Sequence, residues 1–144
     1  MLAALADRAQ GAQCQTPWRE VTVILTDDAG MASFNRAIMG HAGATDVITQ
    51  RYEPLPGETE GLMGEIIVNV ERARQAGPCR RGWSPTHELA LYLAHGCDHL
   101  NGGTDATPAN RLRMRRRELR WLREIGVSDA RPLLDAAGFT RRQA

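Results

Sequence analysis

The sequence has no lysine, no closely spaced pair of cysteines and no long apolar run. A formal net charge of +1 excludes a uniformly basic surface for nucleic-acid binding. The cysteines, Cys14, Cys79 and Cys97, are odd in number and far apart, which disfavours a disulfide scaffold and fits a reducing cytoplasm. No stretch of about 18 apolar residues could span a membrane. The apolar start of the chain is interrupted at Asp7 and Arg8, too early for a signal peptide, so we expect a cytoplasmic protein with no membrane partner.

The proportions of hydrophobic and charged residues are those of an ordinary globular domain. The chain has 144 residues, of which 42% are hydrophobic and 24% are charged. This length suits a single domain, residues 1–144, with a core at about 20–126 and a short C-terminal extension, 127–144. All 18 basic residues are arginines, and seven of them lie between Arg111 and Arg123. That segment is either the solvated face of a helix or a groove for RNA.

Periodicity and capping signals predict strands that alternate with helices. The expected fold is α+β, with a small mixed β-sheet of about four strands and helices packed on it. Asp28 is a candidate N-cap for a helix over Ala29–Met39. Ser84 followed by Pro85 is a strong start signal for a longer helix over Pro85–Leu100. Strands are predicted over Glu20–Thr26, Thr45–Tyr52 and Met63–Val70, and helices over Leu2–Gln10, Ala29–Met39, Glu71–Ala76, Pro85–Leu100, Pro108–Ile125 and Asp129–Ala137.

The stretch His95 to Asp105 has the spacing HxxxHxxGxxD. Histidines four apart project from one face of a helix and can share a metal ion, although such pairs also occur as core or surface histidines. Gly102 and Gly103 let the chain turn after the helix, so that Asp105 can supply a third ligand. We therefore predict one Zn²⁺ ion at the central helix and its following turn, held by three protein ligands and a water molecule.

Three protein ligands with an open position make hydrolysis the expected reaction. The spacing also resembles the extended motif of metzincin proteases, in which glutamate follows the first histidine and acts as general base. This chain has Gly96 at that position, which disfavours a peptidase. Cys97 lies off the histidine face and is expected to be a packed small residue. His87 could approach a substrate cleft or lie on the helix surface, and His41 is in a loop.

The same residues more closely resemble the YbeY family, bacterial rRNA maturation factors regarded as metal-dependent endoribonucleases. The family signature HGxLHLxGYDH is matched in register at His95, Gly96, His99, Leu100 and Gly102. The resemblance covers about residues 20–126. Outside the signature it rests on Asn35-Arg36, on Thr45 to Thr49, on Gly64 to Asn69, on Met114, and on Glu118 to Gly126.

Several positions depart from the family pattern. Asp105 replaces the third histidine, which keeps a ligand but lowers the net charge of the site by one. Asp98 replaces a leucine and could either orient the ring of His95 or face solvent. Met39 stands where the family has an arginine thought to serve the RNA substrate. Arg36, in the same motif, is our candidate for a contact with substrate phosphate.

The resemblance implies a zinc-dependent endoribonuclease that acts on ribosomal RNA and ribosomal particles. His95, His99 and Asp105 would be the metal ligands, and phosphate charge would be neutralised by Arg36, Arg80, Arg81 or the arginines of residues 111–123. One alternative, motivated by Met39, is a ribosome-associated assembly factor with little nuclease activity. Another is a metal-dependent hydrolase of a different substrate.

Overall fold

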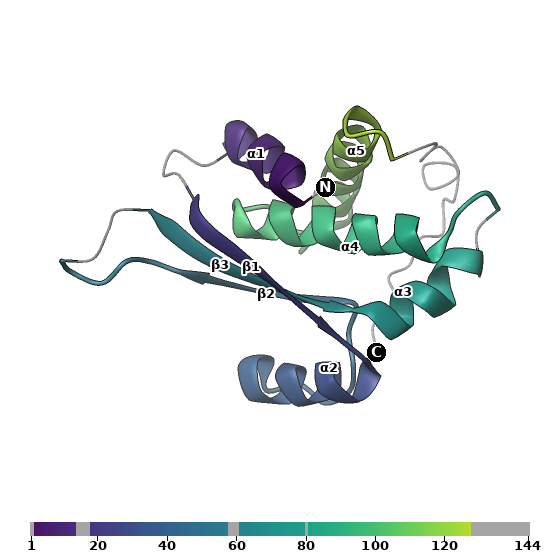
Figure 1. Ribbon diagram of the computed structural model, residues 1–144, viewed down its shortest axis with the longest axis horizontal. Helices are drawn as coiled ribbons and strands as arrows, with labels where there is room; N and C mark the ends of the chain where they lie inside the picture. The colour runs from purple at the N-terminus through teal and green to yellow at the C-terminus, as the bar shows by residue number, and fades with distance from the viewer. Residues whose placement is uncertain (1, 14–17, 58–60, 80, 128–144) are drawn as a thin grey trace.

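The computed structural model describes residues 2–13, 18–57, 61–79 and 81–127. In these segments the chain forms five α-helices, three strands, one π-helical turn and one 3-10 turn (Figure 1). The expected α+β class is confirmed, with a sheet one strand smaller than predicted. The elements are α1 (Leu2–Gln13), β1 (Trp18–Thr26), α2 (Asp28–Phe34), the π-helical turn Asn35–Met39, β2 (Val47–Tyr52), β3 (Leu62–Asn69), α3 (Val70–Ala76), the 3-10 turn Gly77–Cys79, α4 (Pro85–Leu100) and α5 (Pro108–Glu124).

The sheet has the order β1-β3-β2. β3 pairs in parallel with β1, where Val23 lies opposite Ile66, and antiparallel with β2, where Ile48 lies opposite Ile67. β3 is therefore the central strand, as its nearly continuous apolar sequence predicted, and most of its residues are buried.

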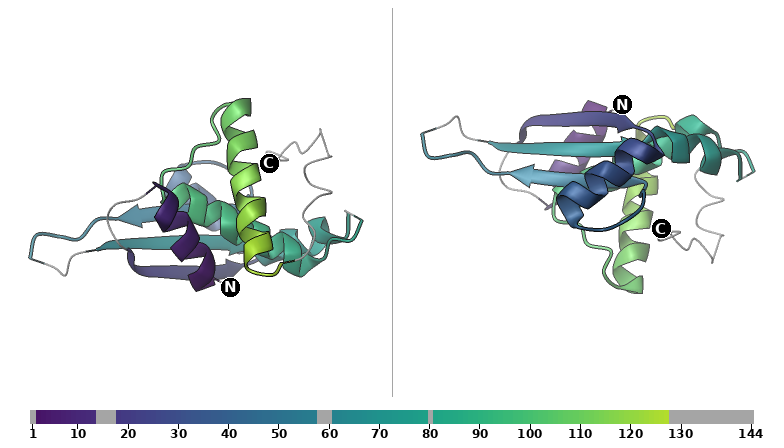
Figure 2. Two further views of the ribbon diagram at one scale, coloured as in Figure 1. Left: turned by 90° about the horizontal axis from the view of Figure 1, so that it is seen from above. Right: turned by 90° about the horizontal axis from the view of Figure 1, so that it is seen from below.

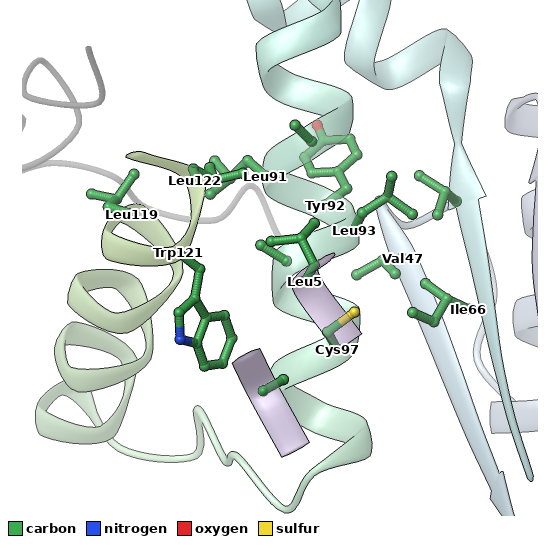
Figure 3. Packing of buried hydrophobic residues seen from close by; sticks show 14 of the residues in the cluster. Leu5, Val47, Ile66, Leu91, Tyr92, Leu93, Cys97, Leu119, Trp121 and Leu122 are labelled. Carbon is green, nitrogen blue, oxygen red and sulfur yellow. The ribbon is translucent and has the colours of Figure 1, made fainter. Parts of the chain in front are cut away.

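Helices cover the sheet on two faces. α4 lies on one face with α1 and α5 above it, while α2 lies on the other face (Figure 1). Because side chains alternate along a strand, Ile66 and Val68 point into the core beneath α4 and Ile67 points toward α2. Figure 3 shows the larger core, in which Leu119 and Leu122 of α5 approach Leu91 of α4.

α4 is buried along most of its length and is fixed at both ends. The hydroxyl of Ser84 accepts a hydrogen bond from the backbone N–H of His87, whose ring Nδ1 in turn accepts one from the backbone N–H of Ser84. Near the other end, an ideal Cβ placed on Gly96 would lie 2.6 Å from Cγ2 of Ile66. The helix therefore approaches β3 more closely than any residue with a side chain would allow at position 96.

The predicted helix start at Asp28 is off by one residue. Asp27 is the N-cap of α2, because its carboxylate accepts a hydrogen bond from the backbone N–H of Gly30. Asp28 instead accepts a hydrogen bond from Asn69 Nδ2 at the end of β3. The predicted helix Asp129–Ala137 lies outside the described residues. Every helix within the described residues is too short or too polar to span a lipid bilayer.

Candidate metal centre

The end of α4 and the turn that follows it bring together His95, His99 and Asp105. One ligand atom from each of the three side chains lies within 4.8 Å of the others, an arrangement that could hold a metal ion. The Nε2 atoms of the two histidines are 3.0 Å apart, and Nε2 of His95 is 4.0 Å from Oδ2 of Asp105. The side chain of His95 is 11% exposed and that of Asp105 is 25% exposed, and His99 is also partly exposed, so the group opens to solvent on the side of His99 and Asp105.

Hydrogen bonds on the far side of each ring determine which nitrogen carries the proton. Nδ1 of His95 lies 2.6 Å from Oε1 of Glu118, and Nδ1 of His99 lies 2.9 Å from the backbone carbonyl of Gly103. Both partners are acceptors, which assigns the proton to each Nδ1 and leaves a lone pair on each Nε2. Two lone pairs facing each other at 3.0 Å repel, so the pair is suited to a cation held between them.

The distances between these atoms also fit a small divalent ion. Two nitrogen ligands about 2.1 Å from a tetrahedral zinc ion lie about 3.4 Å from each other. The separation of 3.0 Å between the imidazole nitrogens and that of 4.0 Å from His95 to Asp105 fall on either side of that value. Small side-chain rotations would therefore complete the ligand set, and its imidazole and carboxylate donors suit zinc.

Glu118 of α5 was not singled out as a site residue from the sequence, although it holds His95 in place. It is 1% exposed, and its second oxygen accepts a hydrogen bond from Arg115 at 3.1 Å. Burial by itself would raise the pKa of Glu118, but the hydrogen bond with His95 and the positive charge of Arg115 lower it. An ionised carboxylate behind a metal-binding histidine fixes the tautomer and orientation of the ring.

Asp98 does not face solvent, so that sequence-based alternative is wrong, and a part for Asp98 in orienting His95 stays a prediction. The residue is fully buried, and its carboxylate accepts two hydrogen bonds from Arg117, at 2.6 Å from Nη2 and 2.9 Å from Nε. Burial raises the pKa of Asp98, and the contact with Arg117 opposes that rise. An ideal Cβ on Gly103 would lie 2.0 Å from Oδ1 of Asp98, so the carboxylate packs directly against the turn that presents its carbonyl to His99.

The sequence contains only a weak signal for the role of Glu118. Glu118 is the single acidic residue among the first sixteen positions of an arginine-rich helix, and Met114 and Leu122 flank it at a spacing of four. That spacing places Glu118 on the buried side of α5. A buried carboxylate implies a cationic or hydrogen-bonding partner, but the identity of that partner depends on how α5 crosses α4.

Other residues raised from the sequence have structural roles. Cys97 is packed in the core, as predicted, and burial, with a smaller effect of Asp98, raises the pKa of its thiol to about 12. His87 caps α4 and stacks on Trp83 with ring centroids 4.9 Å apart. Gly96 faces β3, which leaves no room for the glutamate of a metzincin at this position.

The candidate phosphate contact does not lie with the three metal-site residues. Arg36 is exposed on the π-helical turn that follows α2, on the face of the sheet opposite α4 (Figure 1). Met39, at the position of the expected arginine, is 51% exposed. Arg81 is exposed and Arg80 lies outside the described residues. A phosphate-binding role for Arg36 stays a prediction.

Comparison with known proteins identifies the family of this chain. The family model described as Endoribonuclease YbeY matches residues 2–126. The chain belongs to the YbeY family. This YbeY chain is 37% identical over 108 residues to the Endoribonuclease YbeY of Rhodopirellula baltica, covering 74% of this chain and 54% of that relative.

Two further YbeY relatives agree with this assignment. Identity is 34% over 112 residues with the Endoribonuclease YbeY of Anaeromyxobacter sp., covering 77% of this chain and 57% of the relative. Identity is also 34%, over 116 residues, with the Endoribonuclease YbeY of Roseiflexus sp., covering 76% of this chain and 72% of that relative. The chain thus spans little more than half the length of the first two relatives.

Proposed function

We propose that this YbeY family member is a zinc-dependent endoribonuclease that acts in the maturation of ribosomal RNA. The convergence of His95, His99 and Asp105 in a chain of this family carries the proposal. The relatives are named endoribonucleases, which supports RNA as the substrate. Ribosomal particles are the proposed partners, and the cytoplasm is the proposed compartment.

The proposed chemistry divides between the ion and the chain. A bound zinc ion would polarise a phosphoryl oxygen and lower the pKa of a water molecule. His95, His99 and Asp105 would hold it, and Glu118 and the carbonyl of Gly103 keep both histidines in the ligating tautomer. Asp105 and His99 are both partly exposed, which leaves the substrate a way to approach the ion, whereas His95 is buried against Glu118 of α5.

The first experiment measures zinc. Elemental analysis of gently purified protein is expected to find about one ion per chain, and zinc added to chelator-treated protein is expected to raise its midpoint of thermal unfolding. The substitution His99→Ala should remove both effects. His41→Ala, in an exposed loop, is the matched control and should retain them. Absence of both effects in the parent chain would contradict the metal site.

The second experiment measures RNA cleavage by zinc-loaded protein on structured and single-stranded RNA. Cleavage that is lost in Asp105→Ala and kept in the exposed control Asp7→Ala supports the nuclease. The exposed Met39 at the position of an expected arginine favours a second candidate, an assembly factor with little nuclease activity. Tight binding to ribosomal particles by a zinc-loaded chain that cleaves no RNA would favour that candidate. Cleavage of some other substrate alone would contradict both.

A further inference from the structure

We propose that the outward face of α5 binds the phosphate backbone of RNA. The face is formed by Arg113, Arg116, Arg120 and Arg123, named here the arginine stripe. The proposal rests on the proposed function, because RNA is the substrate there, and it goes further by naming the surface along which that RNA lies.

The four arginines share one side of α5. They follow one another at intervals of three, four and three residues, which places them in a single row on a helix. From Arg113 to Arg123 the row rises about 15 Å. All four side chains are exposed, because the opposite side of the helix is turned toward the core and carries buried residues, among them Met114, Glu118, Trp121 and Leu122. Packing of the core therefore fixes the direction in which the stripe points.

Positive charge is concentrated on this helix. α5 carries seven arginines and two glutamates, whereas the whole chain has a formal net charge of only +1. Glu118 is turned inward to His95, and Glu124 lies 2.9 Å from Arg8 and 3.9 Å from Arg120. Within the described parts of the chain, the side chains of Arg116 and Arg123 make no hydrogen bond or ion pair. Arg116 and Arg123 thus present uncompensated positive charge to solvent, and the two glutamates of α5 leave the helix with a clear excess of arginines.

This charge distribution fits a nucleic-acid backbone better than a protein surface. Guanidinium groups match phosphate oxygens in bidentate geometry, and a row of them can follow successive phosphates. A stable protein interface needs a buried apolar centre. Among the large apolar side chains of α5, only Leu112 is markedly exposed, at 48%. We therefore assign the surface to RNA, which binds through its phosphates without regard to sequence.

The N-terminal end of α5, where the stripe begins, is tied to the loop that carries Asp105. Nη1 of Arg111, in the first turn of α5, donates a hydrogen bond to the backbone carbonyl of Asp105 at 3.0 Å. This end of α5 projects past the β2 edge of the sheet (Figure 2), so RNA can approach it from outside. A strand of RNA held along the stripe would approach the metal centre by way of the loop that carries the partly exposed Asp105 and leads into α5.

The test compares two variants that lose equal charge from exposed positions. The stripe variant is Arg116→Gln with Arg120→Gln and Arg123→Gln, and the control is Arg19→Gln with Arg51→Gln and Arg74→Gln, all outside α5. Binding of the full zinc-loaded chain to a fluorescent 2′-O-methyl oligouridylate is measured by anisotropy over a range of salt concentrations. This probe reports phosphate contacts whether or not the chain cleaves RNA.

The stripe variant should lose about tenfold or more in affinity at low salt, and its slope of log K against log salt should fall by roughly 0.7 per arginine, about 2 in all. The control should stay close to the parent chain. Restoring charge with Arg116→Lys, Arg120→Lys and Arg123→Lys should restore the slope. If the glutamine variant fails to fold, judged by circular dichroism, Arg116→Gln alone should still lower the slope by about 0.7.

Equal losses in the stripe variant and the control would overturn the proposal, as would a parent chain that does not bind the probe. RNA cleavage is assayed separately with unmodified RNA. A chain that shows the stripe-specific loss of binding but cleaves no RNA would keep the surface and contradict the nuclease. A chain that cleaves RNA but shows no stripe-specific loss of binding would support the nuclease and contradict the RNA-binding role of the stripe.

Discussion

The two faces of α5 use the same residue type in opposite ways. On the inward face, Arg115 and Arg117 bind carboxylates that are 1% and 0% exposed, Glu118 and Asp98. On the outward face, the arginine stripe points to solvent. Two arginines next to each other in sequence, Arg116 and Arg117, therefore have different environments because a helix turns about 100° per residue. Composition alone describes α5 as basic, whereas position divides it into a support for the metal centre and a surface for a polyanion.

Truncating one arginine on each face of α5 should lower the stability of the protein by very different amounts. Arg117→Ala leaves the fully buried carboxylate of Asp98 without its bidentate partner. The free energy of unfolding should fall by about 3–5 kcal/mol. Arg116→Ala, one residue earlier, should change it by less than about 0.5 kcal/mol. Urea unfolding of the two metal-free variants measures both values, and equal effects would show that burial does not distinguish the faces.

The next largest effect concerns zinc affinity. Glu118→Ala removes the acceptor of Nδ1 of His95, so the ring loses its fixed tautomer and orientation. The zinc affinity should fall about 10- to 100-fold. Glu118→Gln keeps an oxygen that can accept this hydrogen bond and should recover part of the loss. Competition with a chelating dye measures the affinity, with Glu124→Ala on the exposed part of α5 as the control. If Glu118 served folding alone, its variants would lose stability, but zinc affinity would not fall more in Glu118→Ala than in Glu118→Gln.

Much of this arrangement could be predicted from the sequence because it depends on local signals. The apolar run at Met63–Val70 predicted the central strand, and Ser84 with Pro85 predicted the start of α4. The spacing from His95 to Asp105 predicted which three residues would meet, because helix periodicity and a glycine turn are properties of neighbouring residues. The sheet has one strand fewer than predicted, and the N-cap of α2 is Asp27 and not the predicted Asp28. Both features depend on tertiary contacts and on competition between adjacent residues.

The supporting residues could not be predicted in the same way. Asp98 contacts Arg117, and His95 contacts Glu118, across 19 and 23 positions of sequence. These pairs depend on the crossing of α4 and α5, which no periodicity specifies. Arg36 shows the reverse case, because its family motif is local but its position on the far face of the sheet is set by the topology.

A smaller effect tests how the inward face supports His99. Gly103→Ala would place a Cβ 2.0 Å from Oδ1 of Asp98 and so displace either the turn or the pair with Arg117. The free energy of unfolding should fall by about 2 kcal/mol, and zinc affinity should fall with it because the carbonyl of Gly103 orients His99. At Gly102, φ is +90° and nothing lies within 4 Å of an added Cβ.

Gly102→Ala is therefore the matched control, since it adds backbone strain without a collision. Its stability should fall by about 1 kcal/mol, with less effect on zinc affinity than Gly103→Ala. Calorimetric titration of both variants with zinc compares them. The same loss of affinity in both would mean that the turn matters only through its backbone conformation, and not through its contact with Asp98.

The smallest effect separates burial from ion-pair length. Nε of Arg8 lies 2.9 Å from Oε2 of Glu124, nearly the same length as the 2.6 Å contact between Arg117 and Asp98. The side chains of the first pair are 36% and 46% exposed, so solvent and salt screen their attraction. Glu124→Ala should lower the free energy of unfolding by at most about 0.5 kcal/mol, and by nothing measurable at high salt. A larger, salt-independent loss would mean that α1 depends on this contact to pack against α5. In that case the outward side of the helix, too, would contribute to the fold.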